Sequence, residues 1–177
     1  GAGMLLYPAQ VAEVLAPIAE YPEIQFSLKM RLGWENASEC MVLVELLNAL
    51  RLSRIALHAR TGKQQYKGHP DLEAFQGFYE LCQHPLYYNG GIESLSDIRQ
   101  ILIRFPLLKG VFIGRGLLSS PLLAKEFKGN ETFLPEQRMS IYFAFHQELF
   151  SAYSQVLQGE TQLLVKMKTL WEYFLPE

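Results

Sequence analysis

Hydrophobic and polar positions follow two different periods along the first part of the chain. Residues 24–31 alternate strictly between apolar and polar side chains, which is typical of a β-strand buried on one face. In residues 5–20 and 38–51 the hydrophobic positions recur every three or four residues, so both segments are predicted to be helices. Pro8 suits the first turn of the first helix, and Ser38 is a candidate N-cap for the second.

The alternation of strand and helix continues to about residue 130. Further strands are predicted over 53–60, 86–88 and 110–113, and further helices over 71–83, from Ser94 or Ser96, and from about Pro121. Strands that alternate with helices imply right-handed crossovers and a parallel sheet, so the fold class is α/β. Residues 136–157 and 161–174 are predicted to be two aromatic-rich helices joined at Gly159.

Composition narrows the class of protein. The chain has 177 residues, 49% hydrophobic and 19% charged, with a net charge of −2. These values exclude a disordered chain, and no apolar run approaches the ~18 residues that span a bilayer. The N-terminus lacks the features of a signal peptide, so we expect a cytoplasmic protein without a membrane segment. Cys40 and Cys82 cannot form a zinc site by themselves, and both fit small core residues, so no metal is expected.

Polar and glycine residues gather where the four predicted strands end. They are Lys29 and Arg31, His58 and Arg60, Asn89, Gly90 and Gly91, and Gly114 and Arg115. In parallel α/β folds, ligands bind outside the carboxyl ends of the strands, and backbone N–H groups of glycine-rich segments approach phosphates. The pattern predicts a site for an anionic cofactor or substrate. Taken one at a time, each residue also has a structural explanation, such as a turn at 89–91 or a solvated strand edge.

Four segments in this order resemble the tRNA-dihydrouridine synthases: SLKMRLGW at 27–34, ALHART at 56–61 followed by QYKG at 65–68, YNGGI at 88–92, and VFIGRGL at 111–117. The opening Gly-Ala-Gly also matches a family segment. The resemblance is good over residues 1–127 and looser in the helical tail. It implies a flavin enzyme with an FMN-binding (β/α)₈ barrel and a helical domain that helps to hold tRNA, here residues 1–130 and 131–177. The family reduces the C5–C6 double bond of uridines and uses NADPH as reductant.

The resemblance also assigns roles to the residues at the strand ends. Lys29 would lie against the N1/O2 edge of the flavin, and His58 would contact the same ring. The phosphate and ribityl arm would be held by Asn89, Gly90, Gly91, Gly114 and Arg115. Candidates for contact with substrate or tRNA are Arg31 and Arg60 at the mouth of the site, and Lys166 and Lys168 in the tail.

The chain departs from the family pattern in two respects. It supplies only the last four strands of the barrel, and it lacks the Asn-x-Gly-Cys-Pro loop whose cysteine donates a proton to uridine. We therefore expect a C-terminal portion of a synthase that has no catalytic residue of its own and is inactive alone. A half barrel leaves strand edges unpaired and is expected to expose an apolar inner surface. The expected partners are the missing half of the barrel or a second copy of the chain.

Two other functions remain open. Another FMN-dependent TIM-barrel oxidoreductase, such as a dihydroorotate dehydrogenase-like enzyme, would share the phosphate site. A non-catalytic RNA-binding module is the second alternative, although a net charge of −2 gives no overall attraction to a phosphate backbone. A local basic patch could still be formed by Lys63, Lys67, Arg138, Lys166 and Lys168.

Overall fold

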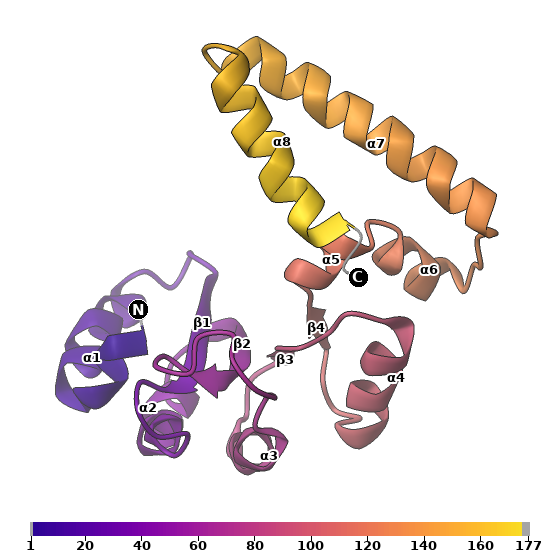
Figure 1. The fold of residues 1–177 in the computed structure, drawn as a ribbon. Coiled ribbons are helices and arrows are strands. Elements are labelled where there is room, and N and C mark those ends of the chain that lie inside the picture. Colours follow the sequence, from indigo (N-terminus) through magenta and orange to yellow (C-terminus); the bar gives the residue numbers. More distant parts are fainter. Residues whose placement is uncertain (1, 175–177) are drawn as a thin grey trace. The chain divides into compact units, whose positions relative to one another are not determined.

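A computed structural model describes residues 2–174 and divides the chain into two compact units. The first unit is Gly1–Gly91 with Asp97–Phe112, and the second is Ile92–Ser96 with Ile113–Glu177 (Figure 1). The division falls at Phe112, whereas the predicted domain boundary near residue 130 marks the end of the α/β pattern and stays a prediction.

The first unit contains a parallel sheet of four strands in chain order. The strands are β1 Phe26–Gly33, β2 Leu52–Thr61, β3 Leu86–Asn89 and β4 Gly110–Phe112. All four lie within one residue or a few of the predicted segments. Because each strand pairs in parallel with its sequence neighbour, every connection must cross over through a helical segment. The predicted α/β class with a parallel sheet is confirmed, and this sheet fits part of a TIM barrel.

Helical segments precede and separate these strands. They are the 3₁₀ turns η1 Ala2–Leu6, η2 Ala16–Glu20 and η3 Glu39–Leu43, and the helices α1 Pro8–Leu15, α2 Val44–Asn48, α3 Leu72–Leu81 and α4 Leu95–Arg104. Pro8 stands in the first turn of α1, as predicted. Ser38 precedes η3 but makes no side-chain cap, because its backbone is already helical, whereas Asp71 caps α3 by accepting from the amide of Ala74.

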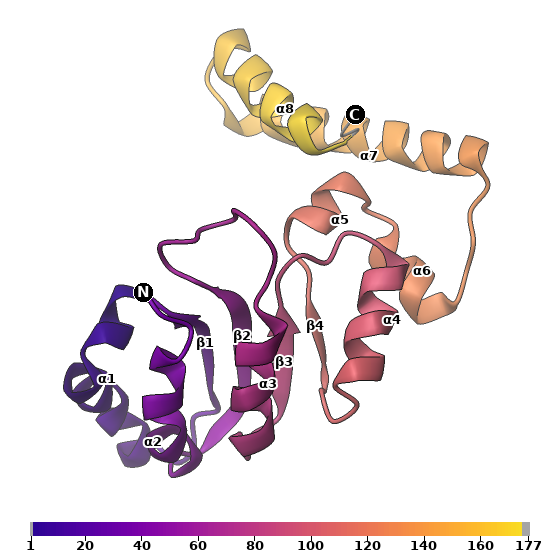
Figure 2. The same ribbon diagram turned by 60° about the horizontal axis from the view of Figure 1, so that its bottom comes forward.

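The core of the first unit lies between the sheet and its helices, and Figure 2 shows α2 and α3 along one side of the strands. Phe75 on α3 packs edge-to-face against Tyr88 on β3 and against Phe105, with ring centroids 4.9 Å and 5.0 Å away. All three aromatic side chains are almost fully buried. Aromatic pairs in this geometry contribute about 0.5–1.5 kcal/mol beyond the area that they bury, so this cluster fixes α3 on the sheet.

Over β1 and β2 the face of the sheet opposite to these helices is polar, whereas on β3 and β4 the aromatic side chains of Tyr87 and Phe112 lie on this face, so the predicted apolar inner surface holds only in part. Ser27, Lys29 and Arg54 project from β1 and β2 on this face and are exposed. The reason is the period of two, since the alternation that sends Met30 and Leu57 toward the helices sends the charged neighbours the other way.

The second unit consists, in its described residues, of helices and connecting loops. The helices are α5 Arg115–Ser119, α6 Leu123–Gly129, α7 Pro135–Val156 and α8 Glu160–Phe174. The helix predicted from about Pro121 is α6, and the short helix α5 before it was not predicted. Ser120 leaves the helical conformation, with φ −135° and ψ 85°, and so ends α5. The long pair was predicted correctly, and Gly159 joins it with a φ of +90°, a conformation that favours glycine.

The α7–α8 hairpin is held together at a few aromatic contacts. Phe174 packs against Tyr142 at 5.2 Å, and Trp171 lies 5.1 Å from His146 between ring centroids. At the start of α7, Arg138 pairs with the buried carboxylate of Glu126 on α6. Within residues 2–174, no helix is both long and apolar enough to cross a membrane.

Candidate functional site

The strand register places three of the predicted site residues in one row across the sheet. Arg31 on β1 is the register partner of His58 on β2, and His58 is the partner of Asn89 on β3. The row continues to Phe112 on β4. Since partners in a parallel ladder point to the same face, the side chains of Arg31, His58 and Asn89 lie together on the polar face near the carboxyl ends of their strands.

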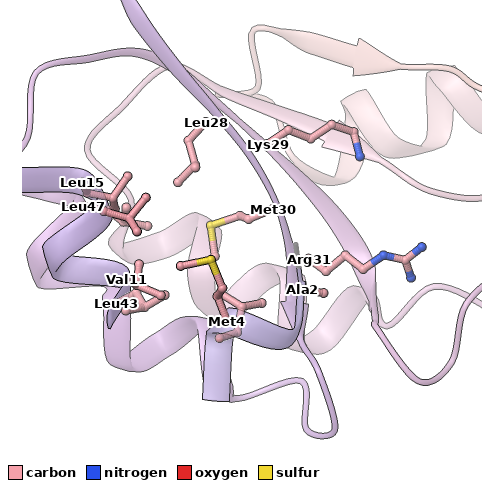
Figure 3. A pocket seen from close by; sticks show the side chains of 12 residues that line it. Ala2, Met4, Val11, Leu15, Leu28, Lys29, Met30, Arg31, Leu43 and Leu47 are labelled. Atoms are coloured by element: carbon pink, nitrogen blue, oxygen red, sulfur yellow. The ribbon is translucent and has the colours of Figure 1, made fainter. Parts of the chain in front are cut away.

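Lys29 lies on the same face, two residues before Arg31 and opposite Ala56. Figure 3 shows the side chains of Lys29 and Arg31 pointing away from Leu28 and Met30, which turn to the other side of β1. Although Lys29 is largely exposed, partial desolvation of its ammonium lowers the pKa, and the positive charge of Arg31 lowers it further. The ammonium group of Lys29, which lies beside this row, therefore holds its proton less tightly than an ordinary lysine does.

Beneath the edge of β1, on the helix side, lies an apolar cavity of about 330 Å³. Figure 3 shows its walls. It is lined by Ala2, Met4, Leu5, Val11, Val14, Leu15, Leu28, Lys29, Met30, Arg31, Leu43 and Leu47. The sequence pattern assigned the apolar positions of these helices to the core and gave no sign of a cavity, because periodicity shows which face is apolar but not whether a neighbour fills it.

His58 is a buried histidine, 5% exposed, in contact with an arginine from its own strand. The Nη1 atom of Arg60 lies 3.4 Å from Nε2 of His58, and Nη2 of Arg60 donates to the carbonyl of Gly68 at 2.9 Å. The ring of Tyr66 lies 6.5 Å from the imidazole ring between centroids. A guanidinium group, an imidazole and a phenol thus meet at the carboxyl end of β2.

Arg31 and Arg60 both bind the loop that follows β2, residues 62–71, and Arg31 also binds Thr61, the last residue of β2. Nη1 of Arg31 donates to the carbonyls of Thr61 at 2.7 Å and Gln65 at 3.0 Å. Its guanidinium also lies 5.8 Å from the centroid of the Tyr66 ring. Both arginines were predicted at the mouth of the site. That role stays a prediction, and in the structure the donors of both arginines are directed at backbone carbonyls of residues 61–68.

The same loop is braced from within. The side-chain amide of Gln64 donates to the carbonyls of Lys67 and His69, and its oxygen accepts from the amide of Thr61. Gln65 adopts a φ of +53°, which non-glycine residues take only when surrounding contacts enforce it. Tyr66 and Gln64 are the site residues that the sequence reasoning missed, although both lie in or beside the QYKG segment that carries the resemblance.

The glycines after β3 are required by the local geometry. Gly90 and Gly91 have φ values of +136° and +59°, and a Cβ on Gly90 would lie 3.2 Å from the His58 ring. A Cβ on Gly91 would lie 2.9 Å from Pro70. The side chain of Asn89 donates to the carbonyl of Phe112 at 2.7 Å, so it joins β3 to β4. These residues shape the row of side chains whether or not they also hold a ligand.

The predicted residues of the second unit are described within that unit. Arg115 begins the short helix α5, and Gly114 precedes it with open space where a Cβ would stand. Lys166 on α8 lies 5.7 Å from the ring centroid of Tyr153, and Lys168 lines a cavity with His146 and Trp171.

Two members of the predicted basic patch are engaged elsewhere, since Arg138 pairs with Glu126 and Lys63 pairs with Glu35 at 2.5 Å. An ion pair removes most of the positive field that a phosphate backbone would meet at these positions.

The cysteines have the environment of structural thiols. Cys40 is fully buried, and burial raises the pKa of its thiol to about 12. Burial also raises the pKa of Cys82. A thiol in such surroundings stays protonated and unreactive, which agrees with their assignment as core residues. Among residues 2–174 no group of three or more histidine, cysteine, aspartate or glutamate side chains is placed to hold a metal ion.

Known proteins of one family are similar to this chain. The family model for dihydrouridine synthases matches residues 1–174. The chain is 25% identical over 165 residues to tRNA-dihydrouridine synthase B of Vibrio vulnificus, which covers 89% of the chain and 51% of that relative. It is 34% identical over 128 residues to a probable tRNA-dihydrouridine synthase of Aquifex aeolicus, and 30% identical over 122 residues to one of Rhizobium leguminosarum.

These alignments cover 71% and 68% of the chain and 40% and 38% of the two relatives. The chain thus spans about half the length of the curated relatives that it matches, or less. A match along nearly the whole chain shows that this protein belongs to the dihydrouridine synthase family.

Proposed function

We propose that the chain forms the flavin-facing part of a tRNA-dihydrouridine synthase, which reduces the C5–C6 bond of uridine in tRNA. The observation that carries the proposal is the row of Arg31, His58 and Asn89 across three adjacent strands, with Lys29 beside it. Four donor-bearing side chains on one face at the carboxyl ends of parallel strands suit an anionic, nitrogen-rich ligand. Membership of the dihydrouridine synthase family supports FMN as that ligand.

The residues present fit FMN by their chemistry. Lys29 offers an ammonium group that can stabilise negative charge, and Asn89 and His58 offer neutral polar atoms on the same face. We propose that Gly90 and Gly91 in the first unit bind the phosphate and ribityl arm. Gly114 and Arg115, which are described within the second unit, are proposed for the same role from their sequence motif alone. When bound, FMN would supply the hydride for uridine after recharging by NADPH.

In this proposal Arg31 and Arg60 position the loop after β2 and do not contact tRNA directly. Because both direct guanidinium donors at carbonyls of the loop after β2, they hold Tyr66 beside His58 and keep the mouth of the site in one shape. Lys166 and Lys168 on α8 are the proposed phosphate contacts to tRNA. The exposed aromatic residue Trp171 beside Lys168 offers a surface on which a base can stack.

We also propose that the sheet is completed by further strands, from another polypeptide segment or a second copy. In the described residues β1 and β4 pair on one edge only, and such edges are templates for pairing. Cys40 and Cys82 are buried or partly buried thiols with raised pKa values, so neither is proposed as the proton donor to uridine.

Sedimentation velocity recorded at 280 and 450 nm, with FMN added, tests the flavin site and the open edges together. We expect weak FMN binding, because the chain supplies only four strands of the sheet, so FMN absorbance should sediment with the protein at high protein concentration. The boundary should be larger than that of one 20.3 kDa chain. Lys29→Met should weaken FMN binding about tenfold, the size of one charged hydrogen bond. Arg54→Met is the matched control, because Arg54 is exposed on the same face but nearer the amino end of the sheet.

FMN that remains in the supernatant at every protein concentration would contradict the proposed function. Equal losses of FMN affinity in the Lys29→Met and Arg54→Met variants would also contradict it. The loss would then follow from the change in net charge and not from the position of Lys29. A compact monomer would contradict the completion of the sheet by a second copy.

A further inference from the structure

The guanidinium of Arg60 is shared between the proposed flavin site and the loop after β2. Arg60 is 4% exposed, which is rare for a charged side chain. Its Nη1 atom faces Nε2 of His58 at 3.4 Å, and its Nη2 atom donates to the carbonyl of Gly68 at 2.9 Å. One planar group therefore fixes the distance between a buried histidine and a loop ten residues further along the chain.

The contact between Arg60 and His58 has one consistent protonation pattern. A guanidinium group has five N–H donors, no acceptor and a charge that persists at all ordinary pH values. The Nε2 atom of His58 must therefore be the acceptor, and an accepting Nε2 carries no proton. A neutral imidazole with an unprotonated Nε2 has its proton on Nδ1.

We propose that Arg60 is a positioning residue that fixes His58 as the neutral Nδ1–H tautomer. The inference about the tautomer rests on the contact alone, and its catalytic meaning rests on the proposed function. A ligand that reaches Nδ1 of His58 meets a hydrogen-bond donor without a second positive charge. The positive charge near the ring is then supplied by Arg60 itself and by Arg31 and Lys29 on the neighbouring strand, so the imidazole does not need to supply it.

The surroundings of His58 support a single ring orientation. Gly90 leaves only the space that the ring needs, because a Cβ there would lie 3.2 Å from Cδ2 of His58. Charged and titratable groups beside the ring include Arg60 on its own strand and the phenol of Tyr66 in the loop, and Arg31 holds the adjacent register position on β1. Asn89 on β3 is the neutral register partner. Two arginines near one imidazole disfavour a third positive charge.

Arg60 also couples the tautomer to the loop. Its second donor is bound to Gly68, and Arg31 holds the same loop at Thr61 and Gln65. A displacement of the loop would draw the guanidinium away from His58, because the fork of a guanidinium is rigid.

Long-range ¹H–¹⁵N correlation spectra of the chain labelled with ¹⁵N-histidine test this proposal directly at neutral pH. The four histidines give few signals, and His58→Gln identifies those of residue 58 by their loss. We expect His58 to show a protonated Nδ1 and an unprotonated Nε2. Arg60→Met should move the proton to Nε2, the tautomer that histidine prefers in water, while Arg60→Lys, which keeps a cationic donor, should retain at least part of the Nδ1–H form.

Arg54→Met is again the matched control, because it removes an exposed arginine from the same strand and should leave the His58 signals unchanged. A wild-type His58 that is an imidazolium or the Nε2–H tautomer would overturn the proposal, and this result needs no variant to fold. An Arg60→Met variant that is folded and keeps the Nδ1–H form would overturn it as well.

The spectra also separate this inference from the proposed function. A chain that binds no FMN but shows the Nδ1–H tautomer would refute the flavin assignment and support the role of Arg60. A chain that binds FMN but shows the Nε2–H tautomer would support the flavin assignment and refute the role of Arg60.

Discussion

The first unit and the α7–α8 hairpin carry similar apolar patterns, yet they bury them very differently. Phe75 and Phe78 on α3 are fully buried, whereas Phe143 on α7 is 63% exposed and Trp171 on α8 is 48% exposed. No residue of the 22 in α7 is buried. The sheet offers α3 a broad surface to pack on, but two helices alone enclose little volume. An aromatic residue in a helical pattern therefore does not identify a core until its partner surface is known.

The largest expected difference between the two regions is in their response to loss of an aromatic ring. Phe75→Ala should lower the free energy of unfolding of the first unit by about 3–5 kcal/mol, because a buried ring and its two edge-to-face contacts are lost. Phe143→Ala on α7 should change the stability of the second unit by less than about 0.5 kcal/mol.

Urea unfolding followed by tryptophan fluorescence distinguishes the units, since each holds one of the two tryptophans, Trp34 and Trp171. Trp171→Phe leaves a reporter in the first unit, and Trp34→Phe leaves one in the second. If Phe75→Ala and Phe143→Ala lowered the free energy of unfolding of their units equally, the two regions would not differ in how far they depend on buried aromatic rings.

Alkaline pH should weaken the first unit selectively. Burial raises the pKa of Cys40 from 9.0 to about 12 and that of Tyr88 from 10.0 to about 12. In the unfolded chain both groups lose their protons at lower pH, so the stability present below pH 9 is lost as the pH rises toward 12. The loss should reach about 4 kcal/mol by pH 11. Lys29, whose pKa is lowered, acts in the opposite direction, but it is exposed and its effect is small.

The measurement is the same urea titration at several pH values with Trp34 as the reporter. Cys40→Ala should flatten the loss between pH 9 and 11, because it removes the thiol that titrates first. A first unit whose stability is constant to pH 11 would show that the two groups are not protected from solvent.

A smaller effect is expected from the ion pair at the start of α7. Glu126 is 3% exposed while the Arg138 side chain is 33% exposed, so Arg138→Met leaves a buried carboxylate without its partner. We expect a loss of about 2 kcal/mol in the second unit, measured with Trp171 as the reporter. Lys125→Met is the matched control, since the Lys125–Glu131 pair is exposed and 3.8 Å long and should contribute less than about 1 kcal/mol. Equal effects would mean that burial does not strengthen the Glu126–Arg138 pair.

Most of the fold could be predicted because it is encoded in short-range patterns. The period-two segment around Lys29 and the two long terminal helices were predicted almost at their observed bounds. The helix α5 was missed because Gly114 and Gly116 flank its first residue, and glycine weakens any local helix signal. Gly116 is needed for another reason, since a Cβ there would lie 2.2 Å from the carbonyl oxygen of Ile92.

The candidate site was predictable in part for the same reason. Parity along β1 and β2 placed Lys29 and Arg31 on the same face as His58 and Arg60, and the strand register confirms it. The contacts of the two arginines could not be predicted. Arg31 reaches residues 30 and 34 positions away, and nothing in the local sequence marks a carbonyl as its acceptor.

The amino-acid sequence alone determined the order of strands and helices and the face on which each side chain stands, because backbone geometry repeats every two or 3.6 residues. It also carried the motifs that place the chain in its family. The tertiary structure decided how those faces are used: which aromatic rings are buried, which arginine bonds to the loop, and which nitrogen of His58 accepts. These outcomes depend on contacts between distant residues, and such contacts form only when the sheet aligns the strands in register.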